Sequence, residues 1–306
     1  MSVTYPEIVV IVGTGRSGTT YLCRVLKQSM DIGFSSEPKF VMPLHRRLSR
    51  YGDLERPANL RNLVDEIHRG QMFRHLHRVI GIDSRPEDII GRIREPTYTG
   101  VLYAVFQTIA DKRGNARVGY KDPVDAIHLP TLARLLPTAR FVNILRDGRD
   151  VAHSYLKFKW GPTNLYSAAR SWSRVVTTSR RDGAALGDRY HEVRLEDLVQ
   201  NTSESARTLG EFVNRGRDRP QVDDLVNRIE KTKQYAIIDE WKRELNLDQR
   251  YVCEAAAAET LAACGYEIEF DGRFRGFTAR APIYLGADFL HRVRNRLGDK
   301  LQTLRA

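Results

Sequence analysis

Eight consecutive residues near the start of the chain have the types and spacing of a phosphate-binding loop: Gly13-Thr14-Gly15-Arg16-Ser17-Gly18-Thr19-Thr20. A glycine-rich turn between a strand and a helix gathers backbone N–H groups and the positive end of the helix around one anion. Arg16 adds a cation inside the turn, and the hydroxyl side chains of Ser17, Thr19 and Thr20 add donors. The segment therefore predicts a site for a ligand that carries a phosphate group.

Two common nucleotide loops fit this segment less well. The nucleoside-triphosphatase pattern G-x-x-x-x-G-K-[ST] matches at Gly13 and Gly18 but meets Thr19 in place of its lysine, which argues against a triphosphate. The dinucleotide pattern G-x-G-x-x-G also matches, but we expect no strand ending at Asp31 or Glu37 to supply its acidic partner. A glycine turn without a ligand is a weaker alternative, because strand, loop, cation and helix agree.

The elements that would position this loop alternate between strands and helices. Apolar runs predict strands at 8–12 and 141–145, and a further short strand is expected at 190–194, just ahead of an acidic helix start. Helical spacing predicts helices at 19–30 and from residue 150 onward. Continuous β-branched runs are typical of strands buried on both faces. We therefore expect an α/β fold, a three-layer P-loop-like parallel sheet flanked by helices, in a single domain over residues 1–306.

Two further segments stand outside this alternation. Residues 44–110 are helical in pattern and rich in Arg and His, and we expect a helical insertion over the active site that shapes acceptor specificity. Residues 281–306 predict a C-terminal amphipathic, basic helix. Packing within the chain or in a homo-oligomer is the favoured interpretation of that helix, and contact with a membrane surface is the alternative.

The composition indicates an ordinary globular protein with an anionic partner. The 306 residues include 49 Lys and Arg against 38 Asp and Glu, a net charge of +11. Arginines are spread along the chain without interleaved aromatics, so we expect no nucleic acid partner. The three cysteines have neither disulfide nor zinc spacing, and we see no signal peptide or transmembrane run. We expect a soluble, cytoplasmic protein without a metal site, although an ectodomain cut from its anchor would look the same.

A second segment, together with the glycine-rich loop, resembles the motifs of a known family. This segment is Ile-Leu-Arg-Asp-Gly-Arg-Asp-Val-Ala-His-Ser at 144–154. Together the two resemble, in the right order, the nucleotide-binding segments of the sulfotransferase family. The resemblance implies transfer of a sulfuryl group from 3′-phosphoadenosine-5′-phosphosulfate (PAPS) to a hydroxyl acceptor, with 3′-phosphoadenosine-5′-phosphate (PAP) as the product. It implies that Arg146 and Ser154 hold the 3′-phosphate, with Arg149 as an additional cation. It assigns the 5′-phosphosulfate to Gly15, Arg16, Ser17, Gly18, Thr19 and Thr20.

The likeness is greater to the protein-tyrosine and carbohydrate sulfotransferase branch, whose loop also has Arg-Ser-Gly-Thr-Thr. That branch implies a catalytic glutamate at Glu37 and a Lys-Asp-Pro segment, matched here from Lys121. Glu37 is the expected base, while Arg16 and Lys121 would offset the negative charge that develops during transfer. His128 is the alternative base. Ordinary salt bridges are the competing interpretation: Arg146 with Asp147, Arg149 with Asp150, and Glu37 with Lys39.

Trp241 and Lys242 match more loosely a family segment that closes over the nucleotide. The acceptor has no readable motif, so a peptide tyrosine, a carbohydrate, a lipid and a small natural product all stay open. The many Arg and His residues of 44–110 suggest that it is acidic. The alternative functions are a P-loop small-molecule or nucleotide kinase and a non-catalytic nucleotide-binding module. Glu37 and Lys121 argue against the second of these.

Overall fold

The structure, a computed structural model, describes residues 3–35, 37–158, 161–215, 219–270, 274 and 281–288. The chain divides into two compact units. The first unit comprises residues 1–145 and 179–236, and the second comprises residues 146–178 and 237–306. A single domain over the whole chain stays a prediction.

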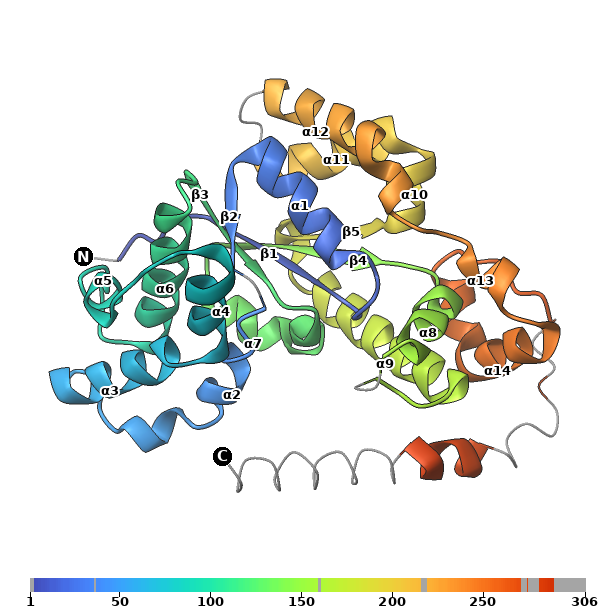
Figure 1. Cartoon of the computed structure of the whole chain (residues 1–306), viewed down its shortest axis with the longest axis horizontal. Helices are drawn as coiled ribbons and strands as arrows, with labels where there is room; N and C mark the ends of the chain where they lie inside the picture. Colours follow the sequence, from blue (N-terminus) through green and yellow to red (C-terminus); the bar gives the residue numbers. More distant parts are fainter. Residues whose placement is uncertain are drawn as a thin grey trace. The chain divides into compact units, whose positions relative to one another are not determined.

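The described strands belong to the first unit and form one five-stranded parallel sheet (Figure 1). The strands are β1 (Ile8–Gly13), β2 (Ile32–Phe34), β3 (Arg117–Lys121), β4 (Ala139–Leu145) and β5 (Tyr190–Arg194). Their order across the sheet is β2-β3-β1-β4-β5. Every residue of β1 and β4 is buried, as expected for apolar strands of a sheet that is covered on both faces.

Helices cover the two faces of this sheet in the first unit. On one face α1 (Thr19–Met30) packs with α12 (Arg219–Thr232), and α12 lies beside α11 (Thr202–Asn214) (Figure 1). On the other face α6 (Tyr98–Lys112) lies against β2 and β3. Gly33 permits the close approach of α6, since a Cβ there would lie 2.7 Å from the Cα of Ala110. These layers confirm the predicted α/β class. The shorter helices of this unit are η2 (Pro123–His128), α7 (Leu129–Leu135), η3 (Gly187–Arg189), α10 (Leu195–Gln200) and η4 (Lys233–Tyr235).

The chain between β2 and β3 forms a set of helices, which confirms the helical pattern of residues 44–110. Pro57 and Pro86 each occupy a first helical position, where the missing N–H removes no hydrogen bond. The set ends in α6, which is buried over most of its length and anchors the insertion to the sheet. The other members are α2 (Val41–His45), η1 (Leu48–Tyr51), α3 (Pro57–His68), α4 (Gln71–Ile80) and α5 (Pro86–Ile90).

The second unit is helical in its described residues. It contains α8 (Gly148–Leu156), the first part of α9 (Leu165–Ala184), α13 (Glu240–Glu244) and α14 (Leu247–Ala263). Trp172 is buried in its core, and its Nε1 donates a hydrogen bond to the carbonyl oxygen of Arg146 at 3.0 Å. The ring lies so close to Gly148 that a Cβ there would be 2.6 Å from it. Glycine therefore allows α8 to begin against the indole.

The predicted C-terminal helix is only partly described. Residues 281–288 are helical, whereas 289–306 lie outside the described residues, so the homo-oligomer stays a prediction. Within the described ranges, no helix has the length and apolar character needed to cross a bilayer. Across the same ranges, no group of three or more His, Cys, Asp or Glu side chains is arranged to hold a metal ion.

Two short strands differ from the sequence-based expectation. No strand of the described chain ends at Asp31 or Glu37, in agreement with the expectation, but the strand β2 at residues 32–34 was itself not expected. Three residues are too few to show an alternating or continuous apolar pattern. We also did not expect β3, whose sequence Arg-Val-Gly-Tyr-Lys mixes charged, small and aromatic residues although four of its five positions are buried.

Candidate active site

The loop after β1 has the backbone of a phosphate-binding turn. Gly13 and Gly18 have positive φ angles of 151° and 94°, and a Cβ on Gly13 would lie 2.5 Å from a carbonyl oxygen of β4. Arg16 has a φ of 69°, a conformation that is unfavourable for a residue with a side chain and that is often found at functional sites. Ser17 Oγ donates a hydrogen bond to the carbonyl oxygen of Thr14 at 2.6 Å, which closes the turn.

The start of α1 can receive an anion. Gly18 is its N-cap residue, and within the described chain no side chain caps the helix and no acidic residue stands in its first turn. The N–H groups of a first helical turn have no acceptor within the helix. Thr14 Oγ1 is buried and has no hydrogen-bond partner among the described residues. Thr19 is buried, whereas Arg16 and Thr20 are exposed. These features fit a phosphate group at this turn.

Glu37 and Lys121 come together although they lie 84 positions apart in the sequence. Lys121 Nζ donates a hydrogen bond to Glu37 Oε1 at 2.9 Å, and the exposed fractions of the two side chains are 8% and 36%. Lys39 Nζ lies farther away, at 4.0 Å from Glu37 Oε2. The nearer partner of Glu37 is therefore Lys121, rather than the Lys39 of the competing interpretation.

The sheet explains why these two side chains meet. Lys121 is the last residue of β3, and Glu37 follows the neighbouring parallel strand β2. On its other side β3 pairs with β1, with Lys121 opposite Ile11, two residues before Gly13. The carboxyl ends of parallel strands share one edge of a sheet, and α/β proteins bind their ligands at that edge. The loop and the Glu37–Lys121 pair thus belong to the same edge of the first unit.

Buried carboxylates hold the chain that follows β3. Asp122 Oδ2 accepts a hydrogen bond from the backbone N–H of Lys39 at 3.2 Å, and burial raises the pKa of Asp122. Asp125 accepts a hydrogen bond from the hydroxyl of Tyr120. Burial raises the pKa of Asp125 to about 7, with the Asp122 charge adding to this effect and the Tyr120 hydrogen bond opposing it. The Asp122 contact ties the segment after Glu37 to the end of β3.

His128, the alternative base, stands at the end of η2. Its Nε2 lies 2.9 Å from a terminal nitrogen of Arg46. A guanidinium can only donate, so this ring nitrogen is the acceptor. Burial and the Arg46 charge both lower the pKa of His128. Within the described residues no hydrogen bond or ion pair joins His128 to Lys121, so the structure brings Glu37, and not His128, to the predicted cation.

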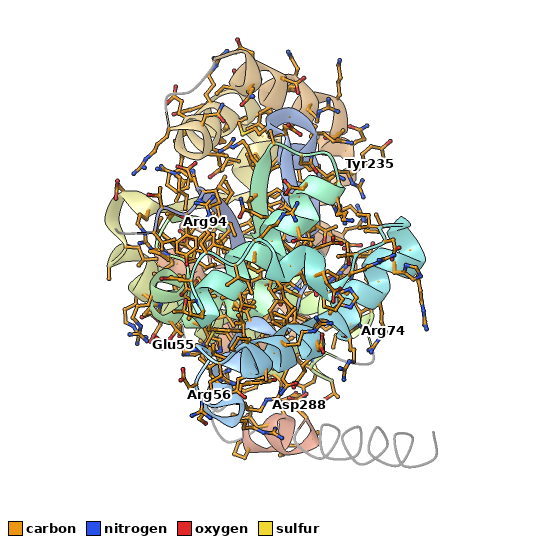
Figure 2. All side chains as sticks on the ribbon, turned by 90° about the vertical axis from the view of Figure 1, so that its left-hand side faces the viewer. Glu55, Arg56, Arg74, Arg94, Tyr235 and Asp288 are labelled. Atoms are coloured by element: carbon orange, nitrogen blue, oxygen red, sulfur yellow. The ribbon has the colours of Figure 1, made fainter. Side chains whose placement is uncertain are left out.

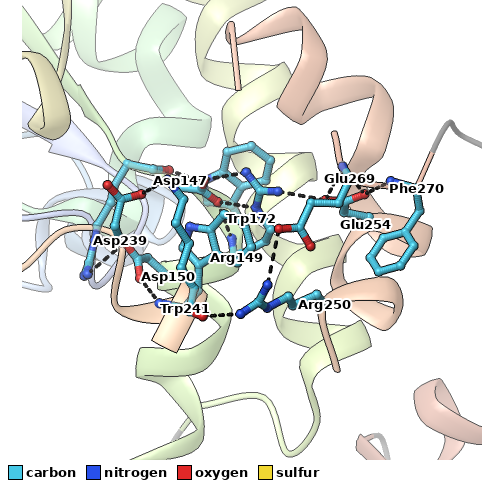
Figure 3. A network of polar contacts seen from close by, with 12 residues as sticks. Asp147, Arg149, Asp150, Trp172, Asp239, Trp241, Arg250, Glu254, Glu269 and Phe270 are labelled. Atoms are coloured by element: carbon cyan, nitrogen blue, oxygen red, sulfur yellow. Dashed lines mark hydrogen bonds and ion pairs between the residues drawn. The ribbon is translucent and has the colours of Figure 1, made fainter. Parts of the chain in front are cut away.

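In the second unit Arg146 and Ser154 are both buried, at 7% and 6% exposure. A terminal nitrogen of Arg146 lies 3.3 Å from Asp150 Oδ2. Asp150 Oδ1 accepts a hydrogen bond from the backbone N–H of Trp241 at 2.9 Å, and burial raises the pKa of Asp150 (Figure 3). Sequence reasoning paired Asp150 with Arg149 only, although its four-residue spacing from Arg146 on a helix was a usable signal.

Arg149 lies in an interior network of the same unit (Figure 3). Its Nε and one terminal nitrogen donate to the two carboxylate oxygens of Asp147 at 3.1 and 2.8 Å. The other terminal nitrogen donates to Glu254 at 2.7 Å, and the guanidinium stacks 3.6 Å from the ring centroid of Trp241. The side chain is 3% exposed. Arg149 therefore forms salt bridges, as in the competing interpretation, but with Asp147 and Glu254 rather than with Asp150. Its contact with a phosphate stays a prediction.

Trp241 and Lys242 differ in their surroundings. Trp241 is buried, and its indole Nε1 has no hydrogen-bond partner among the described residues. Lys242 is exposed, and its ammonium lies 3.0 Å from Asp239 Oδ1. An unpaired buried donor beside Asp150 and Arg149 fits a polar ligand. Lys242 forms a surface ion pair, and its ammonium also lies 5.7 Å from the ring centroid of Trp241.

Comparison with known proteins identifies the family. A profile of the sulfotransferase family matches residues 6–218, so the chain belongs to this family. Protein-tyrosine sulfotransferase 1 of Danio rerio is 22% identical over 215 residues, which cover 68% of this chain and 53% of that protein. A Caenorhabditis elegans protein named for the same activity is 46% identical over 102 residues, which cover 32% of this chain and 39% of that protein. The chain thus matches about half or less of the length of these relatives.

Two solved structures share the fold. The sulfotransferase domain from the Synechococcus PCC 7002 olefin synthase has a TM-score of 0.50 and 19% identity, covering 88% of this chain and 98% of that domain. The sulfotransferase domain from the curacin biosynthetic pathway has a TM-score of 0.50 and 17% identity, covering 87% of this chain and all of that domain. At such identities the likeness concerns the fold, and it agrees with the predicted class.

Proposed function

We propose that this chain transfers a sulfuryl group from PAPS to a hydroxyl acceptor. Membership of the sulfotransferase family supports the reaction class. The observation that carries the proposal is the 2.9 Å contact between Glu37 and Lys121 on the sheet edge that also bears the phosphate-binding turn. A carboxylate that can take a proton and a buried cation beside an anion site are the groups that this transfer requires.

The residues for the two phosphorylated ends of the donor are assigned separately, within each unit. We assign the 5′-phosphosulfate to residues 15–20 of the first unit, supported by the uncapped start of α1 and the unpaired Thr14 hydroxyl. We assign the 3′-phosphate to Arg146 and Ser154 of the second unit, supported by the buried guanidinium and its fixed partner Asp150. A kinase is not proposed, because Thr19 stands where a triphosphate loop has its lysine.

Bound PAPS supplies a sulfuryl group whose bond to the 5′-phosphate oxygen breaks as a bond to the acceptor oxygen forms. Glu37 would take the proton of the acceptor hydroxyl. Lys121 engages Glu37 Oε1, and a carboxylate has enough lone pairs for Oε2 to receive that proton. Arg16 and Lys121 would offset the negative charge on the transferred group and on the departing phosphate oxygen.

The acceptor and the cellular location are also proposals. The net charge of +11 supports an acidic acceptor. A cytoplasmic location rests on the cysteines alone, since Cys23, Cys253 and Cys264 are free thiols. Burial raises the pKa of Cys253 to about 12, which makes this thiol a packing residue rather than a nucleophile.

The test of the proposed function is the formation of PAP from PAPS by the full chain in the presence of a phenol, a sugar, a hydroxysteroid or a tyrosine peptide. We expect PAP formation that depends on one of these acceptors and falls about 100-fold in Lys121→Met, as loss of a stabilising charge predicts. No acceptor-dependent PAP in any class, or an unchanged rate in Lys121→Met, would contradict the proposal.

A further inference from the structure

The first unit contains a cavity of about 610 Å³ beside the segment that carries Glu37. Pro38 and Lys39, the two residues after Glu37, form part of its wall, and α2, η1, α3 and α4, together with residues that flank these helices, supply the rest. A volume of this size is in the range of pockets that bind small molecules. This wall lies next to the Glu37 carboxylate, because Nζ of its residue Lys39 is 4.0 Å from Glu37 Oε2.

The walls of the cavity combine apolar surface with an excess of cations. Phe40 and Met72 are among its apolar lining residues. Its charged lining residues are the cations of Lys39, Arg47 and Arg69 and the carboxylate of Glu66. The cationic side chains are 55%, 47% and 78% exposed, so they remain accessible to a ligand.

The single lining carboxylate is already engaged. Glu66 Oε1 lies 3.5 Å from a terminal nitrogen of Arg47, and Glu66 Oε2 accepts a hydrogen bond from the hydroxyl of Tyr51. Arg69 lies 3.5 Å from Asp65 Oδ2, which uses one of the five N–H groups of its guanidinium. The remaining donors of both arginines can therefore bind an anionic ligand.

The surface around the cavity has the same sign of charge. Residues 44–78 contain eight arginines against four acidic residues. Arg56 and Arg74 are exposed on this part of the first unit, which Figure 2 shows from the side. A cavity within such a surface concentrates anions and raises their rate of encounter.

We infer that this cavity is the acceptor site, and that Arg47 and Arg69 select an acceptor that carries an anionic group in addition to its hydroxyl. The inference rests on the proposed function, because it takes Glu37 as the base toward which the hydroxyl points. The apolar wall would hold the carbon skeleton, and the arginines would bind a carboxylate, sulfate or phosphate group at the other end of the acceptor.

The experiment compares matched acceptors with the full chain at saturating PAPS. The pairs are 4-hydroxyphenylacetate with 4-hydroxyphenylacetamide, and glucuronate with glucuronamide. We expect the carboxylate member to have a kcat/KM roughly tenfold above that of its amide, as two partly exposed charge contacts allow. The double variant Arg47→Gln, Arg69→Gln should bring this ratio close to one. Arg78→Gln, which removes an exposed arginine of α4 that does not line the cavity, should keep it.

Calorimetric titration of each variant with PAP separates this inference from the proposed function. If PAP does not bind the wild-type chain, the proposed function itself fails. If PAP binds, any of three results overturns the inference: amides are equal or better acceptors, neither member of any pair is turned over, or the double variant keeps the wild-type ratio. A salt-dependent ratio that the double variant loses while it still binds PAP supports the inference.

Discussion

Glu254 in α14 should stabilise the second unit through an interior contact that glutamine cannot reproduce. Its side chain is fully buried, and Oε1 accepts a hydrogen bond from Arg149 at 2.7 Å. Oε2 accepts hydrogen bonds from the backbone N–H groups of Glu269 and Phe270, both at 3.2 Å, and the Glu269 N–H also lies 3.1 Å from Oε1 (Figure 3). Glutamine has nearly the same shape but one acceptor oxygen, so its amide NH2 must face either the guanidinium or these two N–H groups.

The magnitude follows from the donors that lose their acceptor. A hydrogen bond to a charged group contributes about 1.5 to 3 kcal/mol, and an unsatisfied buried donor costs about 1 to 3 kcal/mol. Either orientation of the amide therefore predicts that Glu254→Gln lowers the free energy of unfolding by about 2 to 3 kcal/mol. Asp147 still balances the Arg149 charge, so we expect the variant to fold.

The assay is urea unfolding followed by tryptophan fluorescence, which reports on this unit because Trp172 and Trp241 are buried in it. With an m-value of about 2 kcal/mol per M, the midpoint should fall by roughly 1 M. Glu259→Gln removes an exposed carboxylate from the same helix and should change stability by less than about 0.5 kcal/mol. Equal midpoints for the two variants would refute the reasoning.

Three further predictions concern the first unit. Glu37→Gln should lower kcat by at least about 100-fold, the usual contribution of a general base, without changing the Kd for PAP. Glu55→Gln, at an exposed position, is the control. A parallel loss of PAP binding in Glu37→Gln would contradict a role as base. Gly18→Ala places a Cβ within 3.1 Å of Leu195 at a residue whose φ is 94°. We therefore expect the free energy of unfolding measured in urea to fall by about 1 to 3 kcal/mol and PAP binding to weaken. Wild-type values of both quantities would refute this prediction. Asp125 has a folded pKa of about 7, above an unfolded value of about 3.9, so its contribution to stability is lost as pH rises from about 4 to about 7. The free energy of unfolding of the wild type should therefore fall relative to that of Asp125→Asn across this window, and a constant difference would show that Asp125 is not the group responsible.

Local patterns explain which parts of the fold could be predicted from the sequence. The helix expected at 19–30 has those bounds in the structure, because its apolar residues recur at helical spacing. The strand expected at 190–194, just ahead of an acidic helix start, also has the expected bounds. The loop between β1 and α1 was also evident, since its glycines, cation and hydroxyl residues are contiguous. β2 could not be recognised because its three residues owe their strand conformation to pairing with β3.

The missed parts of the site depend on contacts between distant positions. Glu254 lies 105 positions after Arg149, and the residue pattern of neither helix indicates that the two side chains form a contact. Glu37 and Lys121 were both named from a resemblance, but their 2.9 Å contact follows from the pairing of β2 with β3, which the sequence did not predict. Arg149 likewise has distant contacts that the local motif does not indicate, because its guanidinium lies in a buried network with Asp147 and Glu254.

The proposed function requires the chain to bind a nucleotide with phosphate groups at both its 3′ and 5′ positions rather than a triphosphate. Isothermal titration calorimetry of the full chain with PAP, ADP and ATP tests it most directly. Because ADP and ATP lack the 3′-phosphate that we assign to Arg146 and Ser154, we expect PAP to bind about 100-fold more tightly than either, as two charge-assisted contacts predict. ATP binding as tight as that of PAP, or tighter, would contradict the account.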